Sequence, residues 1–159
     1  LPEAQLDRFL MKTDLGYPDH DTTVALLADA ANRNRSSGVG PLITAKAVKD
    51  MATLASQVHV DPAVLSYITS LAEASRRRPD VRLGVSTRGC LACVRVAKTW
   101  AAADGRDHVV PDDIKELAEP VLSHRLLLDA EAQFSGVGVS TVIGRLLDAV
   151  ASPTDRVGS

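Results

Sequence analysis

Apolar residues recur every three or four positions along most of the chain, a spacing typical of helices with one buried face. Each such stretch opens on a residue type that caps or starts a helix. These starts are Asp21, Thr44, Asp61-Pro62, Ser86, Pro111 and Ser140. The pattern predicts a mainly α protein built as a bundle of about five or six helices.

The expected faces and ends follow from the same spacing. We expect Val24, Leu27, Ala28 and Ala31 on one face of the first helix, and Val48, Met51, Ala52 and Ala55 buried on the second. The stretch 33–41 is rich in Ser and Gly and predicts a loop. The longest helix should run from 86 to 103 and end at Asp104-Gly105, and Pro120 should bend the next one.

Residues 9–15 depart from the helical pattern. Phe9, Met11 and Leu15 alternate loosely with polar positions and precede the turn signal Pro18-Asp19, which predicts one short orphan strand over Phe9–Leu15. Its partners are expected outside the chain. The first residue is Leu1, with neither an initiator methionine nor a leader, so we expect the C-terminal part of a larger protein.

Composition limits the classes of function. Apolar residues make up 45% and charged residues 24%, which suits a packed globular domain. With five aromatic residues (one Trp, two Tyr, two Phe), the core must rely on aliphatic side chains. The net charge of -2 gives no attraction to nucleic acid, and no apolar run is long enough to predict a membrane span. Two cysteines without a signal peptide indicate the cytoplasm.

Two arginines stand where a guanidinium could meet a phosphate. Arg8 lies at the junction between an acidic, helix-like turn and the expected strand, and the alternative is a surface arginine near a helix end. Arg88 lies in the first turn of the helix that Ser86 caps, where unpaired N–H groups favour an anion. The alternative there is a guanidinium that turns to a surface carboxylate. The residues alone leave both alternatives open.

Several strings taken together resemble the MoxR family of AAA+ ATPases. They are LPEAQLDRF at 1–9, GYPD at 16–19, GVSTRG at 84–89 and the stretches 101–114 and 121–126. The resemblance extends from residue 1 to about 151. It departs from the family pattern at Thr87, where a proline usually precedes the arginine.

The resemblance implies an AAA+ lid-type helical bundle and three segments. Residues 1–18 would be a remnant of the ATPase core (the end of the finger helix and the last core strand), residues 19–153 the helical lid, and residues 154–159 a flexible tail. Arg8 would be the arginine finger that enters the neighbouring subunit's nucleotide site. Arg88 would be the sensor II arginine that binds nucleotide within its own subunit.

The resemblance also implies properties of the parent protein. The cofactors would be ATP and Mg²⁺, and the assembly a homo-oligomeric ring, expected to be a hexamer. The activity would be chaperone-like remodelling or maturation of client proteins, with a von Willebrand factor A-type domain protein among the candidate clients. The chain has neither a Walker A phosphate loop nor a Walker B strand. By itself it is therefore expected to bind ATP weakly and to hydrolyse none. The alternative is a helical protein-interaction module with no nucleotide role.

Other motifs carry less weight. Cys90 and Cys93 match C-x-x-C, but no second pair of ligands exists for zinc, so they are interpreted as buried small residues. The string at 136–141 resembles a phosphate cradle without a lysine and predicts a flexible turn and helix cap. Arg76–Arg78 predicts a solvated helix end, and His124-Arg125 a helix end rather than a metal ligand. No metal site is predicted.

Overall fold

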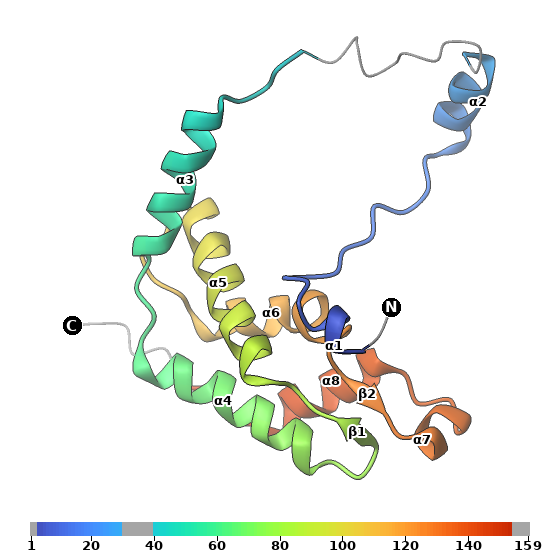
Figure 1. The fold of residues 1–159 in the computed structure, drawn as a ribbon, viewed down its shortest axis with the longest axis vertical. Coiled ribbons are helices and arrows are strands. Elements are labelled where there is room, and N and C mark those ends of the chain that lie inside the picture. The colour runs from blue at the N-terminus through green and yellow to red at the C-terminus, as the bar shows by residue number, and fades with distance from the viewer. Residues whose placement is uncertain (1–2, 30–39, 154–159) are drawn as a thin grey trace.

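The computed structural model describes residues 3–29 and 40–153 of the chain (Figure 1). The helices are α1 (Glu3–Leu6), α2 (His20–Ala28), α3 (Ala45–Gln57), α4 (Pro62–Arg77), α5 (Thr87–Ala103), α6 (Pro111–Leu122), α7 (Ala130–Phe134) and α8 (Val139–Ala149). The strands are β1 (Val81–Leu83) and β2 (Leu127–Leu128). Six of these helices have nine or more residues, so the expected mainly helical bundle is confirmed.

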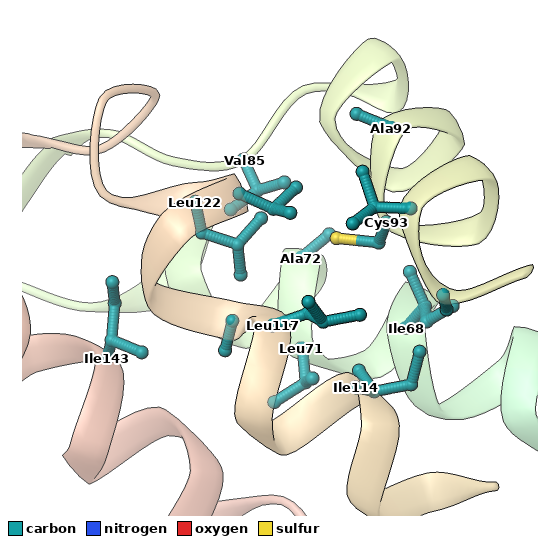
Figure 2. Close-up of a cluster of buried hydrophobic side chains, with 14 of the residues drawn as sticks. Ile68, Leu71, Ala72, Val85, Ala92, Cys93, Ile114, Leu117, Leu122 and Ile143 are labelled. Atoms are coloured by element: carbon teal, nitrogen blue, oxygen red, sulfur yellow. The ribbon is translucent and has the colours of Figure 1, made fainter. Parts of the chain in front are cut away.

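The core lies between α4, α5, α6 and α8, whose inner faces are aliphatic (Figure 2). Side chains on these faces are less than a tenth exposed; they include Ile68 and Leu71 of α4, Cys93 of α5, Ile114 and Leu117 of α6, and Ile143 of α8. Because they repeat at helical spacing, each helix presents one continuous apolar stripe to its neighbours. The four helices therefore form the platform on which the loops at their ends are held.

Four helix starts are where the sequence places them: α6 begins at Pro111, and side chains cap the other three. Thr44 accepts a hydrogen bond from the backbone N–H of Ala47 (3.1 Å). Asp61 does the same for Ala63 (2.7 Å), with Pro62 as the first residue of α4. Ser86 accepts from Gly89 (3.1 Å) and starts α5, which runs to Ala103 as expected. Side-chain oxygens satisfy donors that have no partner inside a helix, which fixes where each helix begins.

Two other starts differ from expectation. Asp19, not Asp21, caps α2 by accepting from the N–H of Thr22 (2.7 Å), which leaves Asp21 in the first turn. Helix α8 already begins at Val139, and the Ser140 hydroxyl donates to a carboxylate oxygen of Glu119 instead of capping the helix. In both cases the true start lies one or two residues earlier, because a suitable backbone conformation precedes the expected cap.

The apolar faces of α2 and α3 are not buried as expected. No residue of α2 is buried, and in α3 only Ala55 is. Val48 and Met51 are about half exposed, and Ala52 is exposed as well. Figure 1 shows α2 standing apart from the body, and α3 contacts the body mainly through α5. Amphipathic spacing forms the helix, but no described element packs on its outer face. Ala31 and most of the expected 33–41 loop lie outside the described residues.

The expected orphan strand over Phe9–Leu15 is wrong. Residues 11–19 have no regular secondary structure, because no strand runs beside them to accept their backbone hydrogen bonds. The only sheet in the described residues is an unexpected one: β1 and β2 pair antiparallel, with Val81 opposite Leu128 and Leu83 opposite Leu127. Both strands are too short to show an alternating pattern in the sequence.

The connection between α5 and α6 is fixed by a buried ion pair. The Arg106 guanidinium meets the Asp113 carboxylate with two contacts of 2.9 and 2.7 Å, and Asp113 also accepts from the N–H of Val110 (2.9 Å). This arrangement holds the start of α6 against the end of α5. No helix of the described residues is both long enough and apolar enough to cross a bilayer. The tail, 154–159, lies outside the described residues.

Candidate functional site

Arg8 follows α1 at a turn. Its backbone N–H donates to the carbonyl of Gln5 (3.1 Å), and the N–H of Phe9 donates to that of Leu6 (3.1 Å). The Arg8 side chain is exposed, and within residues 3–29 and 40–153 no hydrogen bond or ion pair holds its guanidinium. The backbone of this arginine is therefore fixed while its side chain is available to solvent.

Arg88 lies in the first turn of α5, two residues after the cap at Ser86. Its side chain is also exposed, and no partner holds it in the described part of the chain. The helix dipole is positive at this end, and the first N–H groups lack partners within the helix. A free cation at a helix start is unfavourable alone, but the combination suits an anionic phosphate.

Gly84 is the first residue of the GVSTRG string at 84–89, and no larger residue fits at this position. A Cβ at this position would lie 2.7 Å from Cγ of Arg76 and 2.8 Å from Oγ of Ser75. The next residue is held on both sides: the Val85 N–H donates to Ser75 (2.9 Å), and its carbonyl accepts from Nε of Arg76 (2.9 Å). The turn that leads into Arg88 is therefore fastened to the end of α4.

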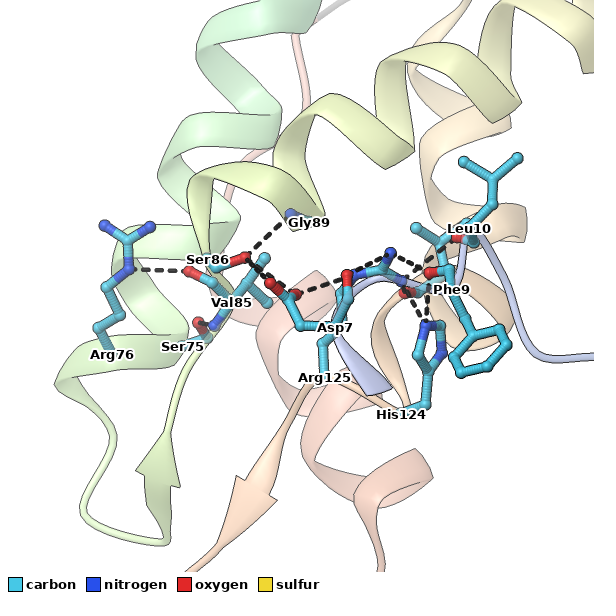
Figure 3. A network of polar contacts seen from close by, with 11 residues as sticks. Asp7, Phe9, Leu10, Ser75, Arg76, Val85, Ser86, Gly89, His124 and Arg125 are labelled. Carbon is cyan, nitrogen blue, oxygen red and sulfur yellow. Dashed lines mark hydrogen bonds and ion pairs between the residues drawn. The ribbon is translucent and has the colours of Figure 1, made fainter. Parts of the chain in front are cut away.

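Asp7 joins the two arginine-bearing segments (Figure 3). The Ser86 hydroxyl lies 3.0 Å from each carboxylate oxygen of Asp7, its neighbour across 79 sequence positions. Asp7 directly precedes Arg8, and Ser86 stands two residues before Arg88. One hydroxyl thus caps α5 and contacts the segment that carries Arg8.

Arg125 contacts Asp7 from the other side. We call the cluster of Asp7, Ser86 and Arg125 the joint. Its side chain is only 2% exposed, and its Nε lies 3.3 Å from the Asp7 carboxylate, an ion pair without hydrogen-bond alignment. The two terminal nitrogens donate to backbone carbonyls of Phe9, Leu10 (3.3 Å) and Val121. A buried guanidinium therefore links the Arg8 segment to the end of α6, as Figure 3 shows.

Electrostatics explain why Asp7 is needed beside this guanidinium. Burial lowers the pKa of Arg125, the negative charge of Asp7 opposes that shift, and the positive charge of Arg88 adds to it. Arg88 is therefore close enough for Arg125 to sense its charge. Asp7 is the carboxylate that offsets the charge of the buried Arg125 guanidinium.

His124 lies beside this cluster. Burial lowers its pKa, and the nearby Arg125 lowers it further. Nη1 of Arg125 lies 2.6 Å from Nε2 of His124, which can accept this hydrogen bond only when that nitrogen carries no proton. The same nitrogen lies 3.1 Å from the carbonyl oxygen of Phe9, so a proton at Nε2 would be donated in a hydrogen bond to that oxygen. A ring that carries a proton at Nε2, whether neutral or charged, therefore donates to Phe9 and cannot accept from Arg125.

Sequence reasoning singled out Arg8 and Arg88 but missed Asp7 and Arg125. The structure brings the two segments together through those missed residues. His124-Arg125 was expected to end a helix, and α6 does end just before it, at Leu122. The available signal in the sequence was Asp7, the acidic residue directly before Arg8. Its partners Ser86 and Arg125 lie 79 and 118 positions away, so the sequence did not reveal them.

The remaining candidates form no second site. Cys93 is buried and Cys90 half-buried, neither is in a disulfide, and burial raises the pKa of Cys93 to about 12. That agrees with the interpretation of both as core residues. In residues 3–29 and 40–153, no three His, Cys, Asp or Glu side chains come together as metal ligands would.

Comparison with known proteins matches residues 73–145 to the AAA lid domain. The chain is 35% identical to YeaC of Bacillus subtilis over 156 residues, covering 98% of the chain and 49% of YeaC. It is 30% identical to the chaperone MoxR1 of Mycobacterium tuberculosis, covering 96% and 42%. A solved structure from Cytophaga hutchinsonii, described as an inferred ATPase, superposes with a TM-score of 0.83 at 31% identity, covering 97% and 49%. The chain therefore spans about half the length of the relatives it matches.

Proposed function

The chain belongs to the MoxR family of AAA+ ATPases and includes the lid, and on that premise we propose that it supplies two arginines to ATP hydrolysis. Arg8 is the finger that enters the neighbouring subunit's nucleotide site. Arg88 is the sensor II residue that contacts nucleotide bound to its own subunit. Residues 1–18 then end the ATPase core, and residues 19–153 form the lid.

One observation carries this proposal: the Asp7–Ser86 contact of 3.0 Å joins two segments, each of which bears an exposed arginine with no partner among the described residues. An arginine with only a structural role is normally paired, as Arg106 is with Asp113. Arg8 and Arg88 instead lie in hydrogen-bonded turns, and their side chains have no partner in residues 3–29 and 40–153. That combination suits residues whose partner is a ligand or another subunit.

The chemistry of both positions fits a nucleotide. A guanidinium offers a planar pair of donors to phosphate oxygens, and a finger of this kind contributes roughly 10³–10⁵ in rate. Arg88 combines its charge with the N-terminus of α5, where backbone N–H groups face an anion. ATP and Mg²⁺ together supply the transferring phosphoryl group and its charge neutralisation. We place no magnesium ligand on the described residues.

The finger assignment requires a ring, because Arg8 acts on a neighbour's site. We propose a homo-oligomeric, hexameric ring in the cytoplasm. One relative bears the name of a chaperone, which supports coupling of hydrolysis to the remodelling or maturation of a client protein. A von Willebrand factor A-type domain protein is the client class we propose.

The decisive experiment measures ATP turnover of the full-length protein with Arg8→Ala. We expect turnover to fall by roughly 10³-fold or more while binding of a non-hydrolysable ATP analogue is retained. Mixing this variant with a subunit whose Walker B carboxylate is neutralised should restore part of the rate. In some mixed interfaces an intact site then meets an intact finger.

A matched control is Arg95→Ala, which removes an exposed arginine in the middle of α5. It should leave turnover unchanged. If the Arg8 mixture stays inactive although mixed rings form, the assignment of Arg8 as a finger acting in trans is wrong.

A helical interaction module is the second candidate, and the exposed apolar side chains of α2 and α3 favour it. Leu27 is 70% exposed and Leu54 60%, both on helices with outward apolar positions. If this candidate were correct, Arg8→Ala and Arg88→Ala would leave the function of the full-length protein intact. Leu54→Glu would then abolish partner binding in a pull-down with the client.

A further inference from the structure

Asp7 occupies a position between the two proposed nucleotide-contacting arginines. Its carboxylate receives the Ser86 hydroxyl and pairs with Arg125, while its peptide bond leads directly to Arg8. Asp7 is about a quarter exposed, whereas its partner Arg125 is 2% exposed. A movement of the α5 start relative to Arg125 therefore strains or breaks the contacts of this carboxylate.

We propose that Asp7 is a positioning residue that couples the lid of a subunit to the finger it offers to its neighbour. The α5 start carries Arg88, so a shift of this end on nucleotide binding is transmitted through Ser86 to Asp7. Arg8 is the next residue and moves with it. The nucleotide bound to one subunit thereby sets the position of the Arg8 finger that this subunit offers to its neighbour's site. This inference rests on the proposed function of both arginines.

The charges at the joint support a coupling that responds to nucleotide. Arg88 and Arg125 are close enough to disfavour one another, and Asp7 is the carboxylate that pairs with Arg125. A phosphate at Arg88 would offset part of the positive charge that Arg125 senses. The balance of attractions on Asp7 then differs between the nucleotide-bound and nucleotide-free lid, as a two-state coupling requires.

The side chains and backbone around the joint are also closely packed. A Cβ on Gly89 would lie 2.8 Å from Val85 and 3.1 Å from Cδ of Arg125, so the first turn of α5 touches the guanidinium stem directly. Ser86 is held by its own cap contact with the Gly89 N–H (3.1 Å). A shift of the helix start therefore cannot be absorbed locally and reaches Asp7.

The test uses mixed rings of the full-length protein with two kinds of subunit. The reporter subunit has an intact nucleotide site but carries Arg8→Ala. The donor subunit has a neutralised Walker B carboxylate but an intact finger. Turnover then arises only where a reporter site meets a donor finger. Asp7→Ala is introduced into the donor in one mixture and into the reporter in the other.

We expect Asp7→Ala in the donor to lower turnover by about 100-fold, because a small misplacement of a positioned group costs about that much. In the reporter, whose finger is already absent, the same change can act only through that subunit's own site and should lower turnover by much less than in the donor. A merely structural Asp7 would lower turnover equally from either side, and that result would overturn the inference. Affinity for a non-hydrolysable ATP analogue should be retained in both mixtures.

Three further variants guard against simple misfolding. Asp7→Asn keeps the shape and an acceptor for Ser86 but loses the charge that pairs with Arg125, so the donor should show a smaller loss. Ser86→Thr keeps the hydroxyl and should retain the rate, whereas Ser86→Ala in the donor should lower it. Equal rates for the Thr and Ala variants would contradict the coupling.

Failure of this inference is separable from failure of the proposed function. If Arg8→Ala in the donor leaves turnover intact, the finger assignment is wrong. If that change abolishes turnover while Asp7→Ala in the donor has no effect, Arg8 remains the finger and only the coupling through Asp7 is refuted.

Discussion

The hydroxyl of Ser75 is fully buried and satisfied on both sides, because it accepts the N–H of Val85 (2.9 Å) and donates to the carbonyl of Ala72 (2.7 Å). This contact brings the turn before α5 so close to α4 that residue 84 has no room for a side chain. This buried hydroxyl thus helps to hold the turn that leads into Arg88 against α4.

Gly84→Ala should destabilise the protein by about 1–3 kcal/mol, because the new methyl group meets the backbone of α4 as well as a side chain. Urea unfolding followed by circular dichroism measures the change. The matched control is Gly144→Ala in α8, where nothing lies within 4 Å of the new carbon. That change should stabilise by up to about 1 kcal/mol through helix propensity. Equal stabilities for the two variants would refute the close approach at Gly84.

Arg88→Ala in the full-length protein should weaken nucleotide binding and its coupling to lid closure. Loss of hydrogen bonds to a charged group costs about 1.5–3 kcal/mol, which corresponds to roughly 10- to 100-fold in affinity. Titration with a fluorescent ATP analogue measures it. Arg88→Lys should recover only part, because lysine lacks the planar pair of donors. Unchanged affinity and ATPase rate in Arg88→Ala would show that this arginine is only a surface charge.

Stability should fall as the pH is lowered through the range where histidine titrates. The pKa of His124 in the folded protein lies below its ordinary value of 6.5, chiefly because of burial. The contribution of neutral His124 is therefore complete above about pH 6.5 and is lost as the pH falls toward the folded pKa, since the unfolded chain binds the proton first. Melting temperatures between pH 7.5 and 5 measure this.

The variant His124→Gln should flatten that dependence, whereas His20→Gln, at the exposed start of α2, should leave it unchanged. An identical pH dependence in the wild type and the His124 variant would rule out this histidine as the source.

Both thiols should resist alkylation in the folded protein. Burial raises the pKa of Cys93 to about 12 and that of the half-buried Cys90 in the same direction, so little thiolate exists at pH 8. Mass spectrometry after iodoacetamide treatment should find Cys93 unmodified until urea is added. Rapid modification of Cys93 without urea would show that α5 is not packed as described.

The helices of the core could be predicted because their signals are local. Asp61-Pro62 and Ser86 specify helix starts through their own side chains, and each following stretch repeats an apolar face. The exposed face of α3 shows the limit of that reasoning. Val48 and Met51 have the spacing of buried residues, but burial depends on a neighbour that a periodic pattern does not identify.

In the candidate site, too, the residues with local signals could be predicted and the long-range contacts could not. Arg8 and Arg88 could be identified from short motifs, because each lies in a recognisable turn. The joint between them could not, because Asp7, Ser86 and Arg125 come together only after α4, α5 and α6 have packed. The strand expected over Phe9–Leu15 failed for a related reason: alternation describes a strand, but a strand exists only beside a hydrogen-bonding partner.

The attachment of the N-terminal segment has a consequence for how this chain can vary in length. Beyond Arg125, the segment is held by the N–H of Lys12, which donates to the carbonyl of Pro120 (2.7 Å) at the end of α6. The chain returns to the same body at α3, which packs on α5. Residues 13–19 leave this attachment point without regular secondary structure, and loop-closure entropy rises by only about 0.6 kcal/mol for each doubling of a connection's length. Insertions between Lys12 and Asp19 should be tolerated thermodynamically, whereas a single residue inserted between Asp7 and Lys12 would put the contacts of Asp7 with Ser86 out of register with the contact of Lys12 with Pro120.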